Sequence, residues 1–177
     1  MYEPAEDSFL LGKYVSKFAR GRVLEIGVGS GYLMEIALKR TKTVKGVDID
    51  KEAVEFCKNK KLDVVYSNLF SNVKGKFDII IFNPPYLPQE KPFLKRNVLE
   101  RKNLDIIGGK EGWELIKRFF KKTDDYLVDK GEILILFSSL TNKKKVDNII
   151  IKKFKFEELE SKSVGLMEKL FVYRCYR

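Results

Sequence analysis

The chain of 177 residues contains no histidine, and this absence excludes several kinds of catalytic site. A histidine general base, a histidine-oriented triad and a metal site with histidine ligands all require a side chain that is missing. Cysteine is almost as scarce, since Cys57 and Cys175 are the only two. We expect both to be buried apolar residues, because disulfides are rare in reducing compartments. No metal site is expected.

Long apolar runs are also absent. No stretch of about 18 consecutive apolar residues occurs, so no transmembrane helix is predicted. The opening Met1-Tyr2-Glu3-Pro4-Ala5-Glu6-Asp7 is acidic, whereas a signal peptide starts with basic residues followed by apolar ones. We therefore predict a cytoplasmic protein. The length suits one domain over residues 1–177 with a core of its own.

Acidic residues are outnumbered by basic ones, 25 against 35, which gives a formal charge of +10. The patches Lys143-Lys144-Lys145 and Lys152-Lys153 suggest a contact with nucleic acid. A solvated Lys/Glu surface, as reported in heat-adapted proteins, is the alternative, and the single glutamine, Gln89, fits that bias. The composition favours the solvated surface and leaves the nucleic-acid contact open.

The most informative stretch is Asn83-Pro84-Pro85-Tyr86, which follows the apolar run Phe77–Phe82. That run is rich in β-branched and aromatic residues and too short for a helix, so it predicts a buried strand of a parallel sheet. Ligands bind at the carboxyl ends of such strands. The two prolines fix two φ angles and remove two backbone donors, which makes this segment stiff.

Such a segment can hold a planar NH₂ group. The oxygen of Asn83 and the carbonyl of Pro84 can accept its two protons, while Tyr86 packs against its plane. A side-chain amide and the exocyclic amine of a base both fit, and two fixed acceptors favour the positively charged nitrogen that forms during attack on carbon. The alternative is a simple strand-ending turn, since Asn and Pro are common turn residues.

A glycine-rich turn, Gly27-Val28-Gly29-Ser30-Gly31, stands between a predicted strand, Arg22–Ile26, and a predicted helix, Tyr32–Lys39. In this arrangement the backbone N–H groups at the helix start face a closely approaching ligand. The spacing lacks the last glycine of the dinucleotide fingerprint, which argues against NAD and for a smaller nucleoside. A glycine-rich turn alone is a weak signal.

Acidic and amide side chains follow the next two strands. Asp48 comes directly after the predicted strand Thr41–Val47, about 20 residues beyond the glycine turn, where a carboxylate can accept from ribose hydroxyls. Asp50 suits the cap of the next helix. Asn68 follows the predicted strand Leu62–Tyr66, and its amide either pairs with a ring edge or belongs to an ordinary turn.

The remaining chain alternates helices and strands. We interpret residues 87–110 as a lid facing the substrate, because long loops in compact domains are usually functional or disordered. A helix is predicted from Trp113 to about Leu127, ended by Gly131. The other predicted elements are a strand over Glu132–Phe137, a helix over Thr141–Ile151, and strands over Phe154–Leu159 and Leu170–Cys175. The alternation predicts a doubly wound α/β sheet, mostly parallel with an antiparallel last strand.

Taken together, Glu25 to Gly31, Asp48 and Asn83-Pro84-Pro85-Tyr86 resemble the class I S-adenosylmethionine-dependent methyltransferases that modify amino groups. The opening Tyr2 to Ser8 and the stretch Gly108 to Gly112 resemble the HemK/PrmC family, in its archaeal and eukaryotic branch. This resemblance implies a Rossmann-like fold and methylation of the glutamine amide nitrogen in the Gly-Gly-Gln motif of class I release factors.

The resemblance also assigns roles to single residues. The implied cofactor-binding residues are Ser8, Glu25, Gly27, Gly29, Gly31, Asp48, Asn68, Leu69 and Asn83. Ser8, on an amino-terminal helical segment of residues 1–20, would close over the cofactor. Glu25 and Gly27 would line its methionine part, Asp48 its ribose, and Asn68 with Leu69 its adenine. The family often has aspartate where this chain has Asn68, which puts that contact in doubt.

The implied substrate-binding residues are Asn83, Pro84, Pro85 and Tyr86, with Asn83, Pro84 and Tyr86 forming the catalytic group. The resemblance further implies a heterodimer with a small zinc-binding activator protein. The strand Leu62–Tyr66 would lie at a sheet edge, which is a surface ready for pairing. Two other functions stay open, namely an adenine N6-methyltransferase acting on RNA or DNA, which needs a flipped base, and a non-catalytic cofactor-binding scaffold.

Overall fold

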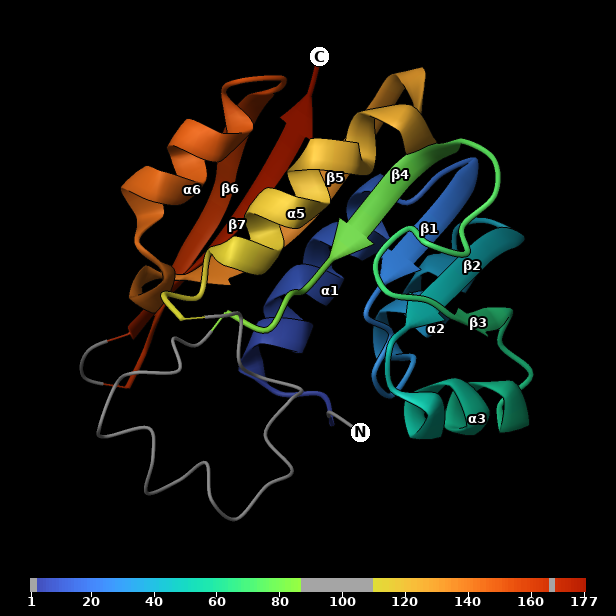
Figure 1. Cartoon of the computed structure of the whole chain (residues 1–177). Helices are drawn as coiled ribbons and strands as arrows, with labels where there is room; N and C mark the ends of the chain where they lie inside the picture. The colour runs from blue at the N-terminus through green and yellow to red at the C-terminus, as the bar shows by residue number, and fades with distance from the viewer. Residues whose placement is uncertain (1–2, 87–109, 166–167) are drawn as a thin grey trace.

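The structure is a computed structural model that describes residues 3–86, 110–165 and 168–177. Figure 1 shows one twisted sheet with helices packed against it. The predicted lid over residues 87–110 lies outside the described residues except for Lys110, and so do Gly108 and Gly109. The part of the chain that the structure describes contains no helix long and apolar enough to cross a membrane.

The elements follow one another in the predicted alternation. The helices are α1 (Glu6–Phe18), α2 (Tyr32–Leu38), α3 (Lys51–Asn59), α5 (Glu114–Thr123) and α6 (Lys143–Ile150), with 3-10 turns η2 (Asp124–Tyr126) and η3 (Ser139–Thr141). The strands are β1 (Arg22–Ile26), β2 (Thr43–Asp48), β3 (Val64–Tyr66), β4 (Phe77–Phe82), β5 (Leu127–Ser138), β6 (Lys155–Val164) and β7 (Glu168–Tyr176).

The sheet has seven strands in the order β3-β2-β1-β4-β5-β7-β6. Strands β1 to β5 run parallel to their neighbours among themselves, whereas β7 is antiparallel to both β5 and β6. The predicted fold class, a mostly parallel doubly wound sheet with an antiparallel end, is therefore confirmed. The first strand, β1, lies inside the sheet, and β2 and β3 follow outwards on one side of it. The chain then returns and places β4 on the other side of β1.

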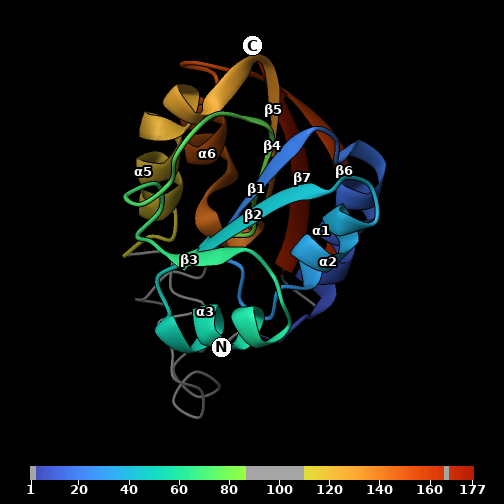
Figure 2. The same ribbon diagram turned by 90° about the vertical axis from the view of Figure 1, so that its right-hand side faces the viewer.

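Helices cover both faces of the sheet (Figure 2). The side chains of the strands alternate between the two layers. Ile79 and Ile81 of β4 pack in the core that α1, α2 and α3 cover, whereas Ile80 and Phe82 pack in the core under α5 and α6. All four are buried, as the apolar run predicts. Burial on both faces explains why this strand has almost no polar residue.

The prediction for the segment around Gly131 was wrong. The helix ends at Thr123, and β5 starts at Leu127, so that Gly131 lies inside a strand instead of ending a helix. The pairing of β4 with β5 shifts register here, from Phe77↔Leu127 to Ile79↔Glu132. A Cβ at Gly131 would lie 3.0 Å from the carbonyl oxygen of Phe77, which explains the glycine at this irregularity.

Both cysteines are free and buried, as predicted. Burial raises the pKa of Cys57 to about 11, so this thiol stays neutral. A neutral buried thiol is neither a nucleophile nor a metal ligand. The strand predictions at the end of the chain were correct in kind but too short, because the β6–β7 hairpin extends to Val164 and Glu168 around its turn.

Candidate functional site

The glycine turn and Asn83 meet where the winding of the sheet reverses. Strands β1 and β4 are parallel neighbours, and Ile26 pairs with Phe82. The residues that follow these two, Gly27 and Asn83, therefore leave the sheet side by side at its carboxyl end. A reversal point of this kind is the usual ligand crevice of an open α/β sheet.

The glycines of the turn adopt left-handed conformations, with φ of 75° at Gly27, 48° at Gly29 and 78° at Gly31. A Cβ at Gly27 would meet no atom of the described residues within 4 Å, so this part of the turn borders open space between them. At Gly31 a Cβ would lie 2.5 Å from Cδ1 of Leu62. Gly31 thus allows close packing against the core, whereas Gly27 leaves room for a ligand.

Asp48 ends β2 and ties the glycine turn to it. Its Oδ2 accepts from the N–H of Gly29 at 3.0 Å, and its Oδ1 accepts from the N–H of Asp50 at 2.8 Å. A carboxylate offers about four acceptor positions, so ribose hydroxyls can still be bound. Asp50 caps α3 as predicted, because its Oδ1 accepts from the N–H of Glu52 at 2.9 Å.

Glu25 is buried in β1, and no group in the part of the chain that the structure describes forms a hydrogen bond with its Oε2. Burial, together with the negative charge of Asp48, raises the pKa of Glu25 well above its usual value. A buried carboxylate is costly unless a cation or donor satisfies it. This orphaned oxygen beside the glycine turn therefore fits the ammonium group of a methionine moiety.

Asn83 is oriented by an acidic residue of α1. Its Nδ2 donates to Oδ2 of Asp7 at 2.9 Å, while its Oδ1 is buried and has no hydrogen-bond partner among residues 3–86, 110–165 and 168–177. Because a carboxylate accepts and does not donate, this contact fixes which end of the amide faces Asp7. The N–H of Ser8 donates to the other oxygen of Asp7 at 2.7 Å. The orphaned Oδ1 is one of the two acceptors that the sequence predicted.

The residues after Asn83 are anchored to the rest of the fold. Pro84 is buried, Pro85 and Tyr86 are half-buried, and the Tyr86 side chain packs against the core beneath α1 and α2. The carbonyl oxygen of Tyr86 accepts from Oγ1 of Thr141 at 3.0 Å. The predicted substrate segment is thus held at Asn83 by α1 and at Tyr86 by η3.

Asn68 and Leu69 lie in a tightly bonded turn after β3. The N–H of Ser67 donates to the carbonyl of Asp48 at 2.8 Å, which places this turn beside the end of β2. The hydroxyl of Ser67 accepts from the N–H of Asn72 at 3.0 Å and donates to the carbonyl of Leu69 at 2.8 Å. Leu69 has a positive φ of 52°. The side chain of Asn68 accepts from Arg118 at 3.0 Å.

Sequence reasoning missed three contacts of this site. In the sequence, Asp7 was noted only as part of an acidic opening and Thr141 only as the start of a helix, and no prediction was made for Arg118. Each acts on a residue at least 50 positions away, so periodicity carries no signal for it.

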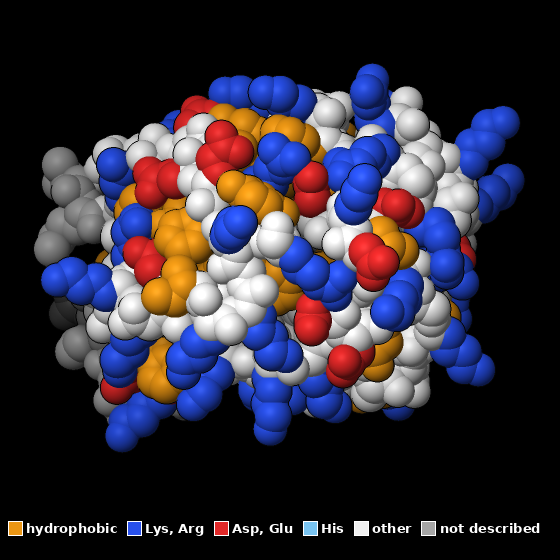
Figure 3. Space-filling model, turned by 90° about the horizontal axis from the view of Figure 1, so that it is seen from above, with side chains coloured by type: hydrophobic (Ala, Val, Ile, Leu, Met, Phe, Trp, Pro, Cys, Tyr) orange, Lys and Arg blue, Asp and Glu red, His pale blue; other side chains and the backbone are white. Residues whose placement is uncertain are grey.

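The basic patches are partly used inside the chain. Lys143 pairs with Asp147 at 3.1 Å, and Lys145 pairs with Glu111 at 2.6 Å and lies over the ring of Trp113. Figure 3, which views the end of the sheet opposite to Asn83, shows lysine and arginine side chains interspersed with acidic ones. This arrangement favours the solvated surface over a dedicated anion site.

Comparisons with known proteins agree with this geometry. The model of a family described as the methyltransferase small domain matches residues 6–101. A putative protein N5-glutamine methyltransferase from Methanocaldococcus jannaschii is 41% identical over the whole chain, which covers 92% of that protein. A release factor glutamine methyltransferase from Aquifex aeolicus is 32% identical over 63% of the chain, which spans only 44% of its length.

A solved structure has the same fold over nearly the full length. The E. cuniculi Mtq2–Trm112 complex, described as responsible for the methylation of the eRF1 translation termination factor, gives a TM-score of 0.78 at 23% identity. The match covers 99% of this chain and 98% of that one. At this identity the likeness establishes the fold alone.

Proposed function

Because the chain belongs to the methyltransferase small domain family, we propose that it methylates the glutamine of the Gly-Gly-Gln motif in a class I peptide chain release factor. The methyl donor is S-adenosylmethionine, and the acceptor is the side-chain amide nitrogen. The M. jannaschii relative is named a putative protein N5-glutamine methyltransferase, and the A. aeolicus relative is named a release factor glutamine methyltransferase. We place the reaction in the cytoplasm, where release factors act.

One observation carries the proposal, the buried Oδ1 of Asn83 beside the glycine turn, for which the described residues provide no hydrogen-bond donor. Leaving an acceptor buried and unsatisfied is costly, so a native site keeps one only for a purpose. A substrate NH₂ group supplies the missing donor. The carbonyl of Pro84 would accept its second hydrogen, and Tyr86 would pack against the plane of the amide.

The proposed cofactor contacts start from the Oε2 of Glu25 and from the open space beside Gly27. Glu25 would hold the ammonium group, Gly27 would leave room for the methionine chain, and Asp48 would accept from the ribose. The further contacts would come from Ser8, Gly29, Gly31, Asn68, Leu69 and Asn83. S-adenosylmethionine supplies an electrophilic methyl group on a sulfonium sulfur.

The chain's own residues act by position and charge. An amide nitrogen is a poor nucleophile, because its lone pair is delocalised into the carbonyl group. Holding it in line with the methyl carbon supplies much of the acceleration. As the new N–C bond formed and the bond from the methyl carbon to sulfur broke, with its electron pair left on sulfur, positive charge would build on nitrogen, and the oxygens of Asn83 and Pro84 would stabilise it. The extra proton then leaves to water, so no histidine is needed.

The exposed edge of the sheet at β3 offers a surface to which a partner protein could bind. Strand β3 is the terminal strand, and the apolar side chains of Ile49, Val65 and Tyr66 near it are 58%, 43% and 45% exposed. A hollow of about 330 Å³ lies next to it, lined by Val54 of α3 and Tyr66 among others. We propose that a small zinc-binding activator protein covers this edge, by analogy with the two-protein E. cuniculi complex.

A nucleic-acid substrate is the second candidate, because an exocyclic adenine amine fits the same two acceptors. Lys144 and Lys152 are exposed and could contact a phosphate backbone. The internal pairing of Lys143 and Lys145 makes this candidate weaker. A scaffold without catalysis would have no use for the oriented Asn83 oxygen.

Transfer of a labelled methyl group separates the candidates. The enzyme with its activator is incubated with labelled cofactor and, in separate reactions, with a release factor, rRNA, tRNA or DNA. We expect label on the release factor, and none after its Gly-Gly-Gln glutamine is replaced by alanine. Label on a nucleic acid alone would support the second candidate, and no transfer to any of them would support the scaffold.

A further inference from the structure

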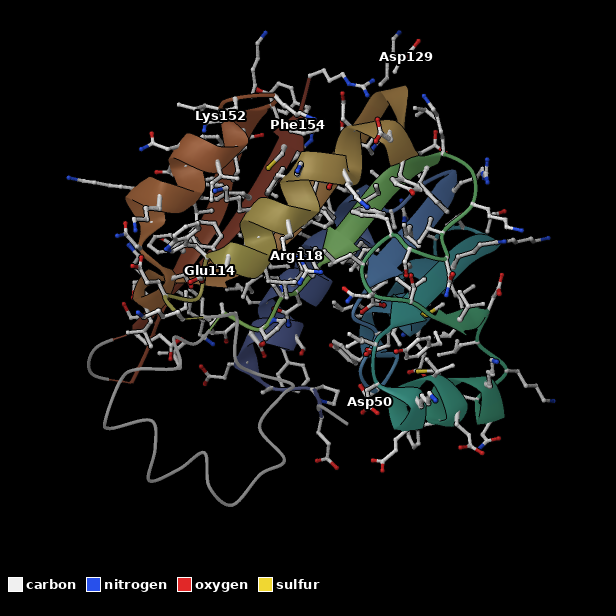
Figure 4. All side chains as sticks on the ribbon, in the orientation of Figure 1. Asp50, Glu114, Arg118, Asp129, Lys152 and Phe154 are labelled. Atoms are coloured by element: carbon white, nitrogen blue, oxygen red, sulfur yellow. The ribbon has the colours of Figure 1, made fainter. Side chains whose placement is uncertain are left out.

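A hydrogen bond across the site joins α5 to the turn after β3. Arg118 donates from Nη2 to Oδ1 of Asn68 at 3.0 Å, although the two residues are 50 positions apart. Figure 4 labels Arg118 on α5, on the opposite face of the sheet from α1 and α2. No function considered so far uses this arginine.

The bond fixes the orientation of the Asn68 amide. A guanidinium group donates and cannot accept, so the amide oxygen must be the end that faces Arg118. The NH₂ end of Asn68 is then left to face other groups as a donor. The backbone N–H of Asn68 also donates to Oγ of Ser71 at 3.1 Å, so the residue is held at both its main chain and its side chain.

The turn that carries this donor adjoins the proposed ribose acceptor, and from this we infer that the donor lies towards the base end of the proposed nucleoside site. Ser67, the residue before Asn68, bonds to the carbonyl of Asp48, whose side chain is the proposed ribose acceptor. The adenine atoms farthest from the ribose are N1 and the N6 amine. Only N1 has an available lone pair, so a donor at Asn68 can pair with N1 and not with the amine. An aspartate here would accept from the amine instead.

We propose that Arg118 is a positioning residue for the cofactor, which holds Asn68 as a hydrogen-bond donor to N1 of the adenine ring. This inference rests on the proposed cofactor site. In this chain residue 68 would donate a hydrogen bond to the adenine ring, whereas an aspartate at the same position would accept one. Arg118 does not touch the cofactor in this account and acts only through Asn68.

Binding of two neutral ligands tests the inference. S-adenosylhomocysteine has N1, and its 1-deaza analogue has a C–H group there. We expect the wild type to bind the analogue about fivefold more weakly, which corresponds to one hydrogen bond. Arg118→Met should weaken S-adenosylhomocysteine about fivefold and leave the affinity for the analogue unchanged. Arg118→Gln, which can still donate, should recover part of the loss.

The matched control is Lys121→Met, which removes one positive charge from the exposed side of the same helix. It should leave the affinity for both ligands unchanged. Equal weakening of both ligands by Arg118→Met would overturn the proposal, since it would indicate a general structural role, and so would unchanged binding of S-adenosylhomocysteine. A wild-type protein that binds neither ligand would instead refute the cofactor site itself.

Discussion

Asp7 and Asn83 form a hydrogen bond of 2.9 Å that links the start of α1 to the end of β4. The residues are 76 positions apart, and the bond leaves the Asn83 oxygen as a buried acceptor. The amino-terminal helix thus fixes which end of the Asn83 amide faces the proposed substrate site. Without Asp7, the Asn83 amide could turn and present its NH₂ group to a substrate that is itself a donor.

The first prediction concerns this orientation. Asp7→Asn should lower kcat for methyl transfer by about ten- to a hundredfold, because the two amides can then pair in either sense. The dissociation constant of the cofactor should change little. The exposed neighbour Glu6 provides a matched control, and Glu6→Gln should leave kcat unchanged. Loss of cofactor binding together with kcat in Asp7→Asn would contradict this assignment.

The second prediction compares two glycines of the turn that share a left-handed backbone, with φ of 75° and 78°. Alanine at either position costs about 1–2 kcal/mol of unfolding free energy for the backbone alone. Gly31→Ala also meets Leu62 and Cys57 and should cost about 1–3 kcal/mol more. Gly27→Ala places its methyl group in open space and should be the milder change.

For cofactor affinity we expect the reverse order, with Gly27→Ala the more damaging of the two changes although it is the milder one for stability. Gly27→Ala should weaken binding at least tenfold, because its methyl group occupies the space we assign to the methionine chain. Denaturant unfolding and calorimetric titration measure the two quantities. Unchanged affinity in Gly27→Ala would show that the ligand does not approach this part of the turn.

The third prediction is a pH dependence that originates at Glu25. Burial raises the pKa of this carboxyl well above its usual value, so the native state keeps a proton that the unfolded chain releases. The contribution of Glu25 to the free energy of unfolding is therefore fully present below the pKa that this carboxyl has in the unfolded chain. It is lost as pH rises through the raised pKa of the native state. Glu25→Gln should remove this part of the slope in urea unfolding measured between about pH 4 and pH 8.

Cofactor binding should depend on pH with the opposite sign. The ammonium group pairs with the ionised carboxylate, so affinity should rise with pH while Glu25 loses its proton. Calorimetric titration in buffers with different ionisation enthalpies should detect release of protons on binding to the wild type. Equal proton release by Glu25→Gln would assign the titration to another group.

The fourth prediction concerns the free edge at β3. Val65→Glu should abolish the complex with the activator protein, because it places a charge on an apolar pairing surface. The melting temperature of the lone chain should change little, since Val65 is 43% exposed. Ile151, 60% exposed at the end of α6, offers the control, and Ile151→Glu should leave the complex intact. Co-elution in size-exclusion chromatography reads both outcomes.

The sequence predicted best where local pattern and burial agree. The bounds of β1 and β4 were correct because a short apolar run stands between turn residues in each case. The start of β5 was missed because Leu127 to Gly131 mixes charged residues with glycine and follows a helical pattern. Its strand character comes from the pairing of Leu127 with Phe77, which no local signal contains.

Candidate site residues were found from their types and their places after predicted strands. The parallel pairing of β1 with β4 brings Gly27 and Asn83 together, as the winding rule for such sheets implies. The sequence could not indicate how the polar atoms orient one another. The roles of Asp7 and Arg118 depend on bonds between distant segments, and only the folded chain brings these together.

The central claim is that the fixed oxygen of Asn83 makes an amide nitrogen reactive, and single-turnover methyl transfer tests it most directly. Wild type and Asn83→Ala, each with the activator and saturating cofactor, are mixed with a release factor, and methylation of its glutamine is followed by mass spectrometry. We predict a loss of at least about a hundredfold in the rate, with cofactor affinity within about threefold of wild type. Equal rates for the two enzymes would contradict the account.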